Sequence, residues 1–335
     1  MNNKAQSRIS ELDSLRAIAA LSVMFFHYTY GFNHGDSHTF FHKGFMGVEL
    51  FFVISGFVIF MTLQNTEKPK QFIVSRFARL YPAYWFSVIM SFILFSIPFF
   101  LNTQVQPNFK ITSISFGRFL ANLSMLQSYF GIEHIDGVYW TLSVELVFYI
   151  IVLLIFCTKK LKYIELIGWG YVFLLFFTHR YVKSIDLTFI RYGLYFLAGI
   201  VYFHIYKDGI NLKKNFTLYL LLLATLLLNL KYFYYNLTEQ LIVGLIYLIF
   251  IFLSLHKLEW LRFKPLIFLG QISYSMYLLH ENIGFLLFNL FDFWGIHNIW
   301  AKIFVTMFLI IVISKISYHL FENLARKKIV NILNR

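Results

Sequence analysis

A series of apolar segments, each close to the roughly 20 residues that a helix needs to cross a bilayer, constrains this fold most strongly. Composition agrees, because 59% of the 335 residues are hydrophobic and only 13% are charged, too few for an ordinary water-facing surface. The expected spans are residues 12–32, 44–63, 82–101, 138–157, 163–178, 190–206, 216–232, 239–256, 266–288 and 299–321. The sequence therefore predicts an all-α integral membrane protein, a bundle of about ten transmembrane helices in a single domain over residues 1–335.

Lysine and arginine predict the orientation of this bundle. With the N-terminus in the cytoplasm, every inner segment is basic, and the inner segments hold more than twice as many of these residues as the outer ones. An even number of spans then places both termini in the cytoplasm. The same asymmetry accounts for the net charge of +13, so no nucleic-acid partner is expected; the partner of the apolar surface is the lipid bilayer.

The external connection from Asn102 to Gly137 is long for a chain otherwise joined by short turns. Its second half, GRFLANLSMLQSYFG at 117–131, is amphipathic and indicates an interfacial or re-entrant helix. A lid that only shields the bundle is an equal alternative.

The first span carries two ionisable residues, Arg16 and His27. They lie about three helical turns apart, on one face and about 16 Å from each other along the axis. Such groups are costly inside a membrane and usually face a cavity or a partner. Arg16 alone could extend to the inner interface, but the pair on one face favours a functional site.

Four ionisable residues from different spans are expected at one level in the outer part of the membrane. Counting the helical rise from each span's end places His27, Glu49, Glu145 and His280 there. Scattered polar residues have no reason to share a depth, whereas a common site requires it. The alternatives are that the two carboxylates are structural partners of a buried cation, and that His280 only supports packing.

Several motifs carry a resemblance to a known family. They are Arg16 and His27 with ten residues between them, GVELFFVISGF at 47–57, RFARLYP at 76–82, YWTLSVE at 139–145 and ISYSMYLLH at 272–280. In this order, spread over nearly the whole chain, they resemble acyltransferase family 3, membrane O-acyltransferases of bacterial cell-surface glycans. The resemblance implies a multi-pass protein of the bacterial cytoplasmic membrane that acylates a hydroxyl group. The chain ends soon after the last span, so the esterase-like domain fused to some members is expected to be absent.

The expected donor is acyl-CoA, with acetyl-CoA favoured, and the expected acceptor is a hydroxyl-bearing glycan. Arginine's planar fork suits phosphate, and the family associates the arginines at Arg76 and Arg79 with acyl-CoA; Arg16 is a third candidate. His27 is expected to act as a general base or as a transient acyl carrier, with Glu145 as its helper. Supporting roles fall to Glu49, Ser55, Tyr277 and His280, and no metal is expected.

A proton-coupled transporter is the competing interpretation, because intramembrane His, Glu and Arg residues also form proton relays. The sequence shows no internal repeat of the kind that many transporters have. That interpretation also leaves Arg76 and Arg79 without a role. The acceptor, the acyl group, the choice between the two routes and the oligomeric state stay open.

Overall fold

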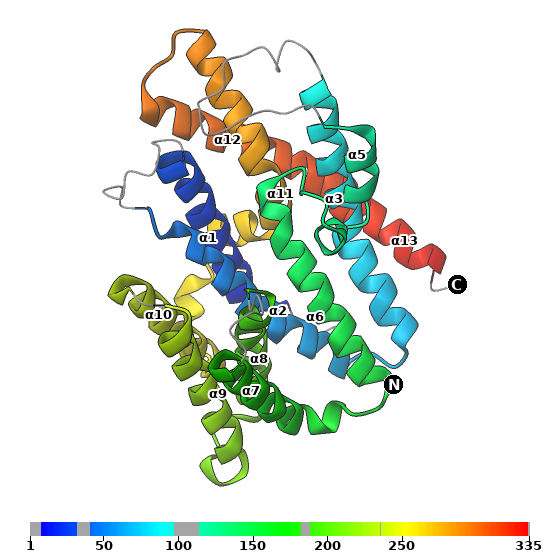
Figure 1. Cartoon of the computed structure of the whole chain (residues 1–335), viewed down its shortest axis with the longest axis vertical. Coiled ribbons are helices and arrows are strands. Elements are labelled where there is room, and N and C mark those ends of the chain that lie inside the picture. The colour runs from blue at the N-terminus through cyan, green and yellow to red at the C-terminus, as the bar shows by residue number, and fades with distance from the viewer. Residues whose placement is uncertain (1–7, 32–40, 97–113, 182–187, 235, 334–335) are drawn as a thin grey trace. The chain divides into compact units, whose positions relative to one another are not determined.

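A computed structural model describes residues 8–31, 41–96, 114–181, 188–234 and 236–333 (Figure 1). These residues are predominantly helical, and none of them forms a strand. The elements are α1 Ser10–Phe26, η1 His27–Gly31, η2 Gly44–Met46, α2 Gly47–Gln64, α3 Pro69–Ser96, α5 Phe116–Asn122, η3 Gln127–Phe130, η4 Gly137–Tyr139, α6 Trp140–Cys157, η5 Leu161–Tyr163, α7 Ile164–Tyr181, α8 Thr188–Asp208, α9 Leu212–Tyr232, α10 Leu237–Ser254, η6 Glu259–Leu261, α11 Lys264–Phe293, α12 Ile299–Ser317, η7 Tyr318–Ala325 and α13 Arg326–Leu333. The prediction of an all-α membrane protein is therefore confirmed at the level of fold class.

In the part of the chain that the structure describes, every predicted span falls on a helix, but the helices are not equally apolar. Residue 32 of the first predicted span and residues 97–101 of the third lie outside the described residues. Within the described residues, seven helical segments are long and apolar enough to cross a membrane, and they contain α2, α3, α6, α7, α9, α10 and α12. The other expected spans fall on α1, α8 and α11, whose residues are largely buried. A helix covered by protein can carry polar side chains that lipid would not tolerate, which explains why these three are less apolar.

The count of ten spans and the cytoplasmic position of both termini stay predictions. Four of the basic residues used to predict the orientation, Lys4, Lys110, Lys183 and Arg335, lie outside the described residues.

Helix α3 begins well before the predicted third span. Pro69 is its first residue, a position where the missing N–H is not needed, and Pro82 lies inside the helix without ending it. Arg76 and Arg79 were expected in a segment that precedes the span. They lie instead about 10 Å and 15 Å along the helix from its start.

The chain packs into two compact units, each discontinuous in sequence. The first contains residues 1–20, 46–61 and 161–271, and the second contains residues 21–45, 62–160 and 272–335. Helix α1 contributes its first half to one unit and its second half to the other.

In the first unit, α8 is the central helix and packs against α9 and α10. Its approach to α2 is unusually close, because a Cβ atom built on Gly56 would lie 2.1 Å from the carbonyl oxygen of Phe196. A Cβ on Gly199 would lie 2.2 Å from the carbonyl oxygen of Val53. Small residues at such crossings let two membrane helices pack backbone to backbone. Asparagine side chains cap the N-termini of α9 and α10. Asn211 accepts a hydrogen bond from the backbone N–H of Lys214, and Asn236 accepts one from the backbone N–H of Thr238.

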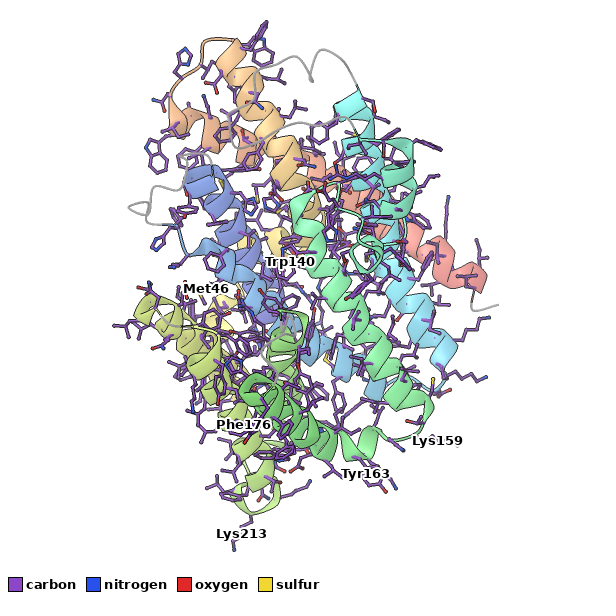
Figure 2. The ribbon with its side chains drawn as sticks, viewed as in Figure 1. Met46, Trp140, Lys159, Tyr163, Phe176 and Lys213 are labelled. Atoms are coloured by element: carbon purple, nitrogen blue, oxygen red, sulfur yellow. The ribbon has the colours of Figure 1, made fainter. Side chains whose placement is uncertain are left out.

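In the second unit, α3 packs against α5, α6, η7 and α13; Figure 1 shows α13 beside α3. The amphipathic segment at 117–131 is partly helical, in α5 and η3. Tyr84 and Trp85 of α3 donate hydrogen bonds to the carbonyls of Asn122 and Leu123, at 2.6 Å and 2.9 Å. The connection after α5 is therefore fixed against α3. Figure 2 labels Trp140, the first residue of α6, and Lys159, which lies two residues beyond its last residue, Cys157.

Candidate active site

His27 lies in the second unit, at the point where α1 changes into the π-helix η1. Its Nδ1 atom lies 3.5 Å from Oε1 of Glu281, and its side chain is 18% exposed. The ring of His280 lies 5.0 Å from the ring of His27, edge to face. An imidazole is therefore held between a carboxylate and a second imidazole, and part of it is accessible. Single-turn π-helices often occur at functional sites.

Packing fixes this turn against α11. The hydroxyl of Tyr28 donates to the carbonyl oxygen of His280 at 2.7 Å, and Tyr28 is fully buried. Gly284 makes room for the tyrosine, since a Cβ there would lie 2.4 Å from the hydroxyl oxygen. The backbone at His27 is thus held relative to the helix that carries Glu281 and His280.

His280 is buried, and its two nitrogens have different surroundings. Nδ1 lies 2.8 Å from the carbonyl oxygen of Tyr277, so the proton belongs on Nδ1. Nε2 then has a lone pair, and it has no hydrogen-bond partner among the described residues. The hydroxyl of Tyr277 accepts a hydrogen bond from Thr141 at 3.0 Å. The structure thus brings together three of the residues singled out from the sequence: His27, Tyr277 and His280.

Asp136 adds a second carboxyl group that the sequence analysis did not single out. It is 1% exposed, and it accepts hydrogen bonds from the backbone N–H groups of Val138 at 3.1 Å and Asn282 at 3.2 Å. Its side chain also lies beside the carboxyl group of Glu281 and interacts with it electrostatically. Burial raises the pKa of Asp136 above its ordinary value.

Glu281 also went unnoticed in the sequence, although a signal was present. It adjoins His280 in the chain, so the argument from depth applies to it equally. Asp136 lies just before a predicted span, where an acidic residue is usually read as a helix cap. It does cap η4, but it is buried as well.

The predicted helper, Glu145, belongs to a second cluster in the same unit. Oε1 of Glu145 accepts a hydrogen bond from Tyr149 at 2.6 Å. Arg76 lies over the ring of Tyr149 at 5.9 Å, and Glu145 interacts electrostatically with Arg79. Two predicted phosphate-binding arginines and the predicted helper are therefore found together, while the carboxylate 3.5 Å from His27 is Glu281.

Arg79 is anchored by Glu322 of the π-helix η7, with which it forms an ion pair. The other oxygen of Glu322 accepts a hydrogen bond from Ser275 at 2.7 Å. Arg326, the first residue of α13, interacts unfavourably with the charges of Arg79 and Arg76. Three arginines thus gather at one place, with Arg326 missed by sequence analysis because it reads as an ordinary positive-inside residue. We refer to Arg76, Arg79 and Arg326 as the arginine cluster.

The remaining predicted site residues, Arg16, Glu49 and Ser55, belong to the first unit. Arg16 lies 3.2 Å from Asp13. Glu49 is buried, accepts a hydrogen bond from Tyr234 at 2.7 Å and lies 3.9 Å from Arg191. Glu49 therefore has the structural partners that the alternative interpretation foresaw. Among the described residues, no group of three or more His, Cys, Asp or Glu side chains is placed to hold a metal ion.

Comparison with known proteins agrees with the motifs. The chain is 26% identical to the peptidoglycan O-acetyltransferase of Listeria monocytogenes over 95% of its own length and 56% of the relative. It is 26% identical to a putative O-acetyltransferase of Staphylococcus aureus, over 99% of this chain and 59% of the relative. A putative acetyltransferase of Acidianus two-tailed virus is also 26% identical, over 84% of each chain.

The chain thus spans little more than half the length of the two bacterial relatives. No solved structure matches it. The model of the acyltransferase domain family matches residues 9–319, which include His27, the arginine at 76, the arginine at 79 and Glu281. The chain therefore belongs to acyltransferase family 3.

Proposed function

We propose that this protein is a membrane O-acyltransferase that moves an acyl group, with acetyl favoured, from cytoplasmic acyl-CoA to a hydroxyl of an extracytoplasmic or lipid-linked carbohydrate. It acts as a multi-pass protein of a bacterial cytoplasmic membrane. The observation that carries the proposal is the contact of His27 with Glu281, 3.5 Å apart, in a chain of this family.

The contact between Glu281 and Nδ1 supports Nε2 as the reactive nitrogen of His27. A carboxylate at Nδ1 holds the proton there and leaves the lone pair on Nε2. Nε2 takes the proton of the acceptor hydroxyl while the hydroxyl oxygen attacks the thioester carbonyl. The C–S bond then breaks, and the thiolate of CoA takes the proton from His27. Glu281 stabilises the imidazolium formed in between, the role that the sequence analysis gave to Glu145.

A covalent route uses the same residues. Nε2 of His27 attacks the thioester carbonyl, the C–S bond breaks, and the CoA thiolate takes the Nδ1 proton and leaves as the thiol. The acyl group then passes from Nε2 to the acceptor hydroxyl, whose proton returns to the imidazole. This route lets the donor leave before the acceptor arrives, and it predicts a burst of CoA release that does not require acceptor. The direct route predicts no release without acceptor.

The arginine cluster holds the phosphates of acyl-CoA. A guanidinium group binds phosphate oxygens with two parallel hydrogen bonds. Three guanidinium groups next to one another repel each other, and a bound anion relieves this repulsion. The ion pair with Glu322 fixes Arg79 in its place. Glu145 and Tyr149 line the same cluster. Arg16 of the first unit, which forms an ion pair with Asp13, is proposed separately as a candidate phosphate ligand.

Helix α11 connects the two clusters and sets the distance between them. Ser275 hydrogen-bonds to Glu322 beside the arginine cluster, and Glu281 lies beside His27. Glu281 follows Ser275 by six positions, about 9 Å along the helix. The extended arm of CoA, comparable to five or six extended residues or roughly 20 Å, is long enough to cover this distance.

A transfer assay tests the proposal. The purified protein, reconstituted in lipid, is supplied with acetyl-CoA and soluble hydroxyl acceptors, and released CoA thiol and acylated product are measured. We expect acylated product in proportion to the CoA released. Proton-driven movement of a solute with no use of acyl-CoA would establish the transporter instead and overturn the proposal.

A further inference from the structure

Two buried carboxyl groups meet beside His27, and their backbone positions are tied together. Asp136 Oδ2 accepts from the N–H of Asn282, the residue after Glu281, at 3.2 Å. The side-chain amide of Asn282 donates a second hydrogen bond, to the carbonyl oxygen of Ile135, the residue before Asp136, at 3.0 Å. These two bonds, both donated by Asn282, join the turn at η4 to α11. Asp136 and Glu281 are therefore held side by side, whatever their charge.

The surroundings leave one oxygen without a donor. Asp136 receives two backbone N–H groups. Oε2 of Glu281 is buried and has no hydrogen-bond donor among the described residues. Two carboxylates in contact cannot satisfy each other, since neither can donate. One added proton removes the conflict, because a carboxylic acid donates to the neighbouring carboxylate.

Gly137 makes this arrangement possible. A Cβ atom on Gly137 would lie 2.6 Å from Oε2 and 2.8 Å from Oε1 of Glu281. The carboxyl group thus rests against the backbone of Gly137, the first residue of η4, with no side chain in between.

We propose that Asp136 and Glu281 share a single proton and act as one monoanionic pair, which sets the protonation state of His27. Asp136 is the positioning residue of the pair, and Glu281 is the member that contacts the imidazole. This rests on the proposed function only where it concerns catalysis.

The shared proton therefore reduces the negative charge next to His27. A lone Glu281 carboxylate would place its full charge 3.5 Å from Nδ1 and favour the imidazolium, which cannot act as a base. Sharing a proton with Asp136 moves part of that charge away. The imidazole is then neutral at working pH, yet it still has an anion beside it when it takes a proton.

The other titratable groups around Asp136 and Glu281 do not set the charge next to His27. His280 is held by the carbonyl of Tyr277, Tyr28 donates to the carbonyl of His280, and Tyr139 is hydrogen-bonded to Ser87. Within the described residues, neither Asp136 nor Glu281 forms an ion pair with a lysine or an arginine. The charge next to His27 is therefore governed by the two carboxyl groups.

Infrared spectroscopy tests the shared proton without any substrate. The purified protein is titrated in lipid while the carbonyl stretch of a buried protonated carboxyl group is followed. We expect one such band near neutral pH, lost in both Asp136→Asn and Glu281→Gln, and retained in Glu133→Gln. Glu133 is a matched control because it lies in the same connection with an 84% exposed side chain. A band that survives in either pair variant, or that is absent from the unaltered protein, overturns the proposal.

The pH dependence of acyl transfer tests the effect on His27. Asp136→Asn puts the whole charge on Glu281, so the acidic limb of the pH–rate profile should move up by about one pH unit. Glu281→Gln removes the nearer charge, so the same limb should move down. A merely structural role of Asp136 would lower the rate and leave the limb in place. If the acidic limb shifts in the same direction in both variants, or in neither, the proposed coupling between the carboxyl pair and His27 is overturned. The infrared test of the shared proton does not depend on this result, and it stands even if no transfer activity is found.

Discussion

At the scale of single residues, the space beside Gly137 decides how Glu281 can lie. Changing Gly137 to alanine places a Cβ 2.6 Å from the carboxyl group of Glu281, so this group has to shift from its position beside His27. A small displacement of a catalytic group costs rate, and we expect kcat to fall roughly tenfold to a hundredfold with KM for acyl-CoA nearly unchanged. Gly117→Ala is the matched control, since nothing lies within 4 Å of a Cβ there. Equal rates for both variants would contradict the role of the contact.

Residue types and expected depth identified part of this site from the sequence. His27 and His280 were expected at one level, and their rings lie 5.0 Å apart. Glu145 was expected at the same level, but depth alone cannot say which way a side chain faces around its helix. Glu145 bonds to Tyr149, whereas the carboxyl group at His27 comes from Glu281. Asp136 could not be predicted, because its burial depends on how the long external connection packs.

At the scale of elements, α13 adds a residue to the donor site that the spans alone do not provide. Arg326→Ala removes one phosphate contact, and each charge-assisted contact is worth about 1.5–3 kcal/mol, so KM for acyl-CoA should rise roughly tenfold to a hundredfold. The maximal rate should change little, because Arg326 is not placed at His27. Lys327→Ala, which removes a neighbouring exposed charge, is the control. If both variants raise KM equally, the site is a diffuse basic surface.

The crossing of α2 and α8 in the first unit depends on glycine. A Cβ on Gly56 would lie 2.1 Å from the carbonyl oxygen of Phe196, a backbone atom that cannot move aside. Gly56→Ala should therefore force the helices apart and cost about 1–3 kcal/mol of stability, seen as a lower Tm in detergent. Gly244→Ala in α10, where a Cβ meets nothing within 4 Å, should leave Tm unchanged or raise it slightly. The GVELFFVISGF motif thus contributes a packing surface, which the sequence alone could not separate from a chemical role.

At the scale of the whole molecule, helix positions were largely predictable and membrane crossings less so. Within the described residues, each span predicted from an apolar run of the right length coincides with a helix. The limits of α3 were missed, because Arg76 and Arg79 make its first half look like a loop, whereas their partners Tyr149 and Glu322 come from distant parts of the chain. The arrangement of charges by topology predicts Lys159 and Lys213 in the cytoplasm and Lys110 outside. Reporter fusions at these residues measure this, and an external signal at Lys159 or Lys213 would contradict the orientation.

The most direct measurement of the central claim is acyl transfer by His27→Ala, with donor binding recorded on the same protein. The account predicts that transfer is lost, because no base or carrier replaces the imidazole. Acyl-CoA should still bind with nearly unchanged affinity, because the arginine cluster holds its phosphates. Arg76→Ala should show the reverse pattern, with weakened binding and residual transfer at high donor concentration. Acyl transfer by His27→Ala at the rate of the unaltered protein would contradict the account.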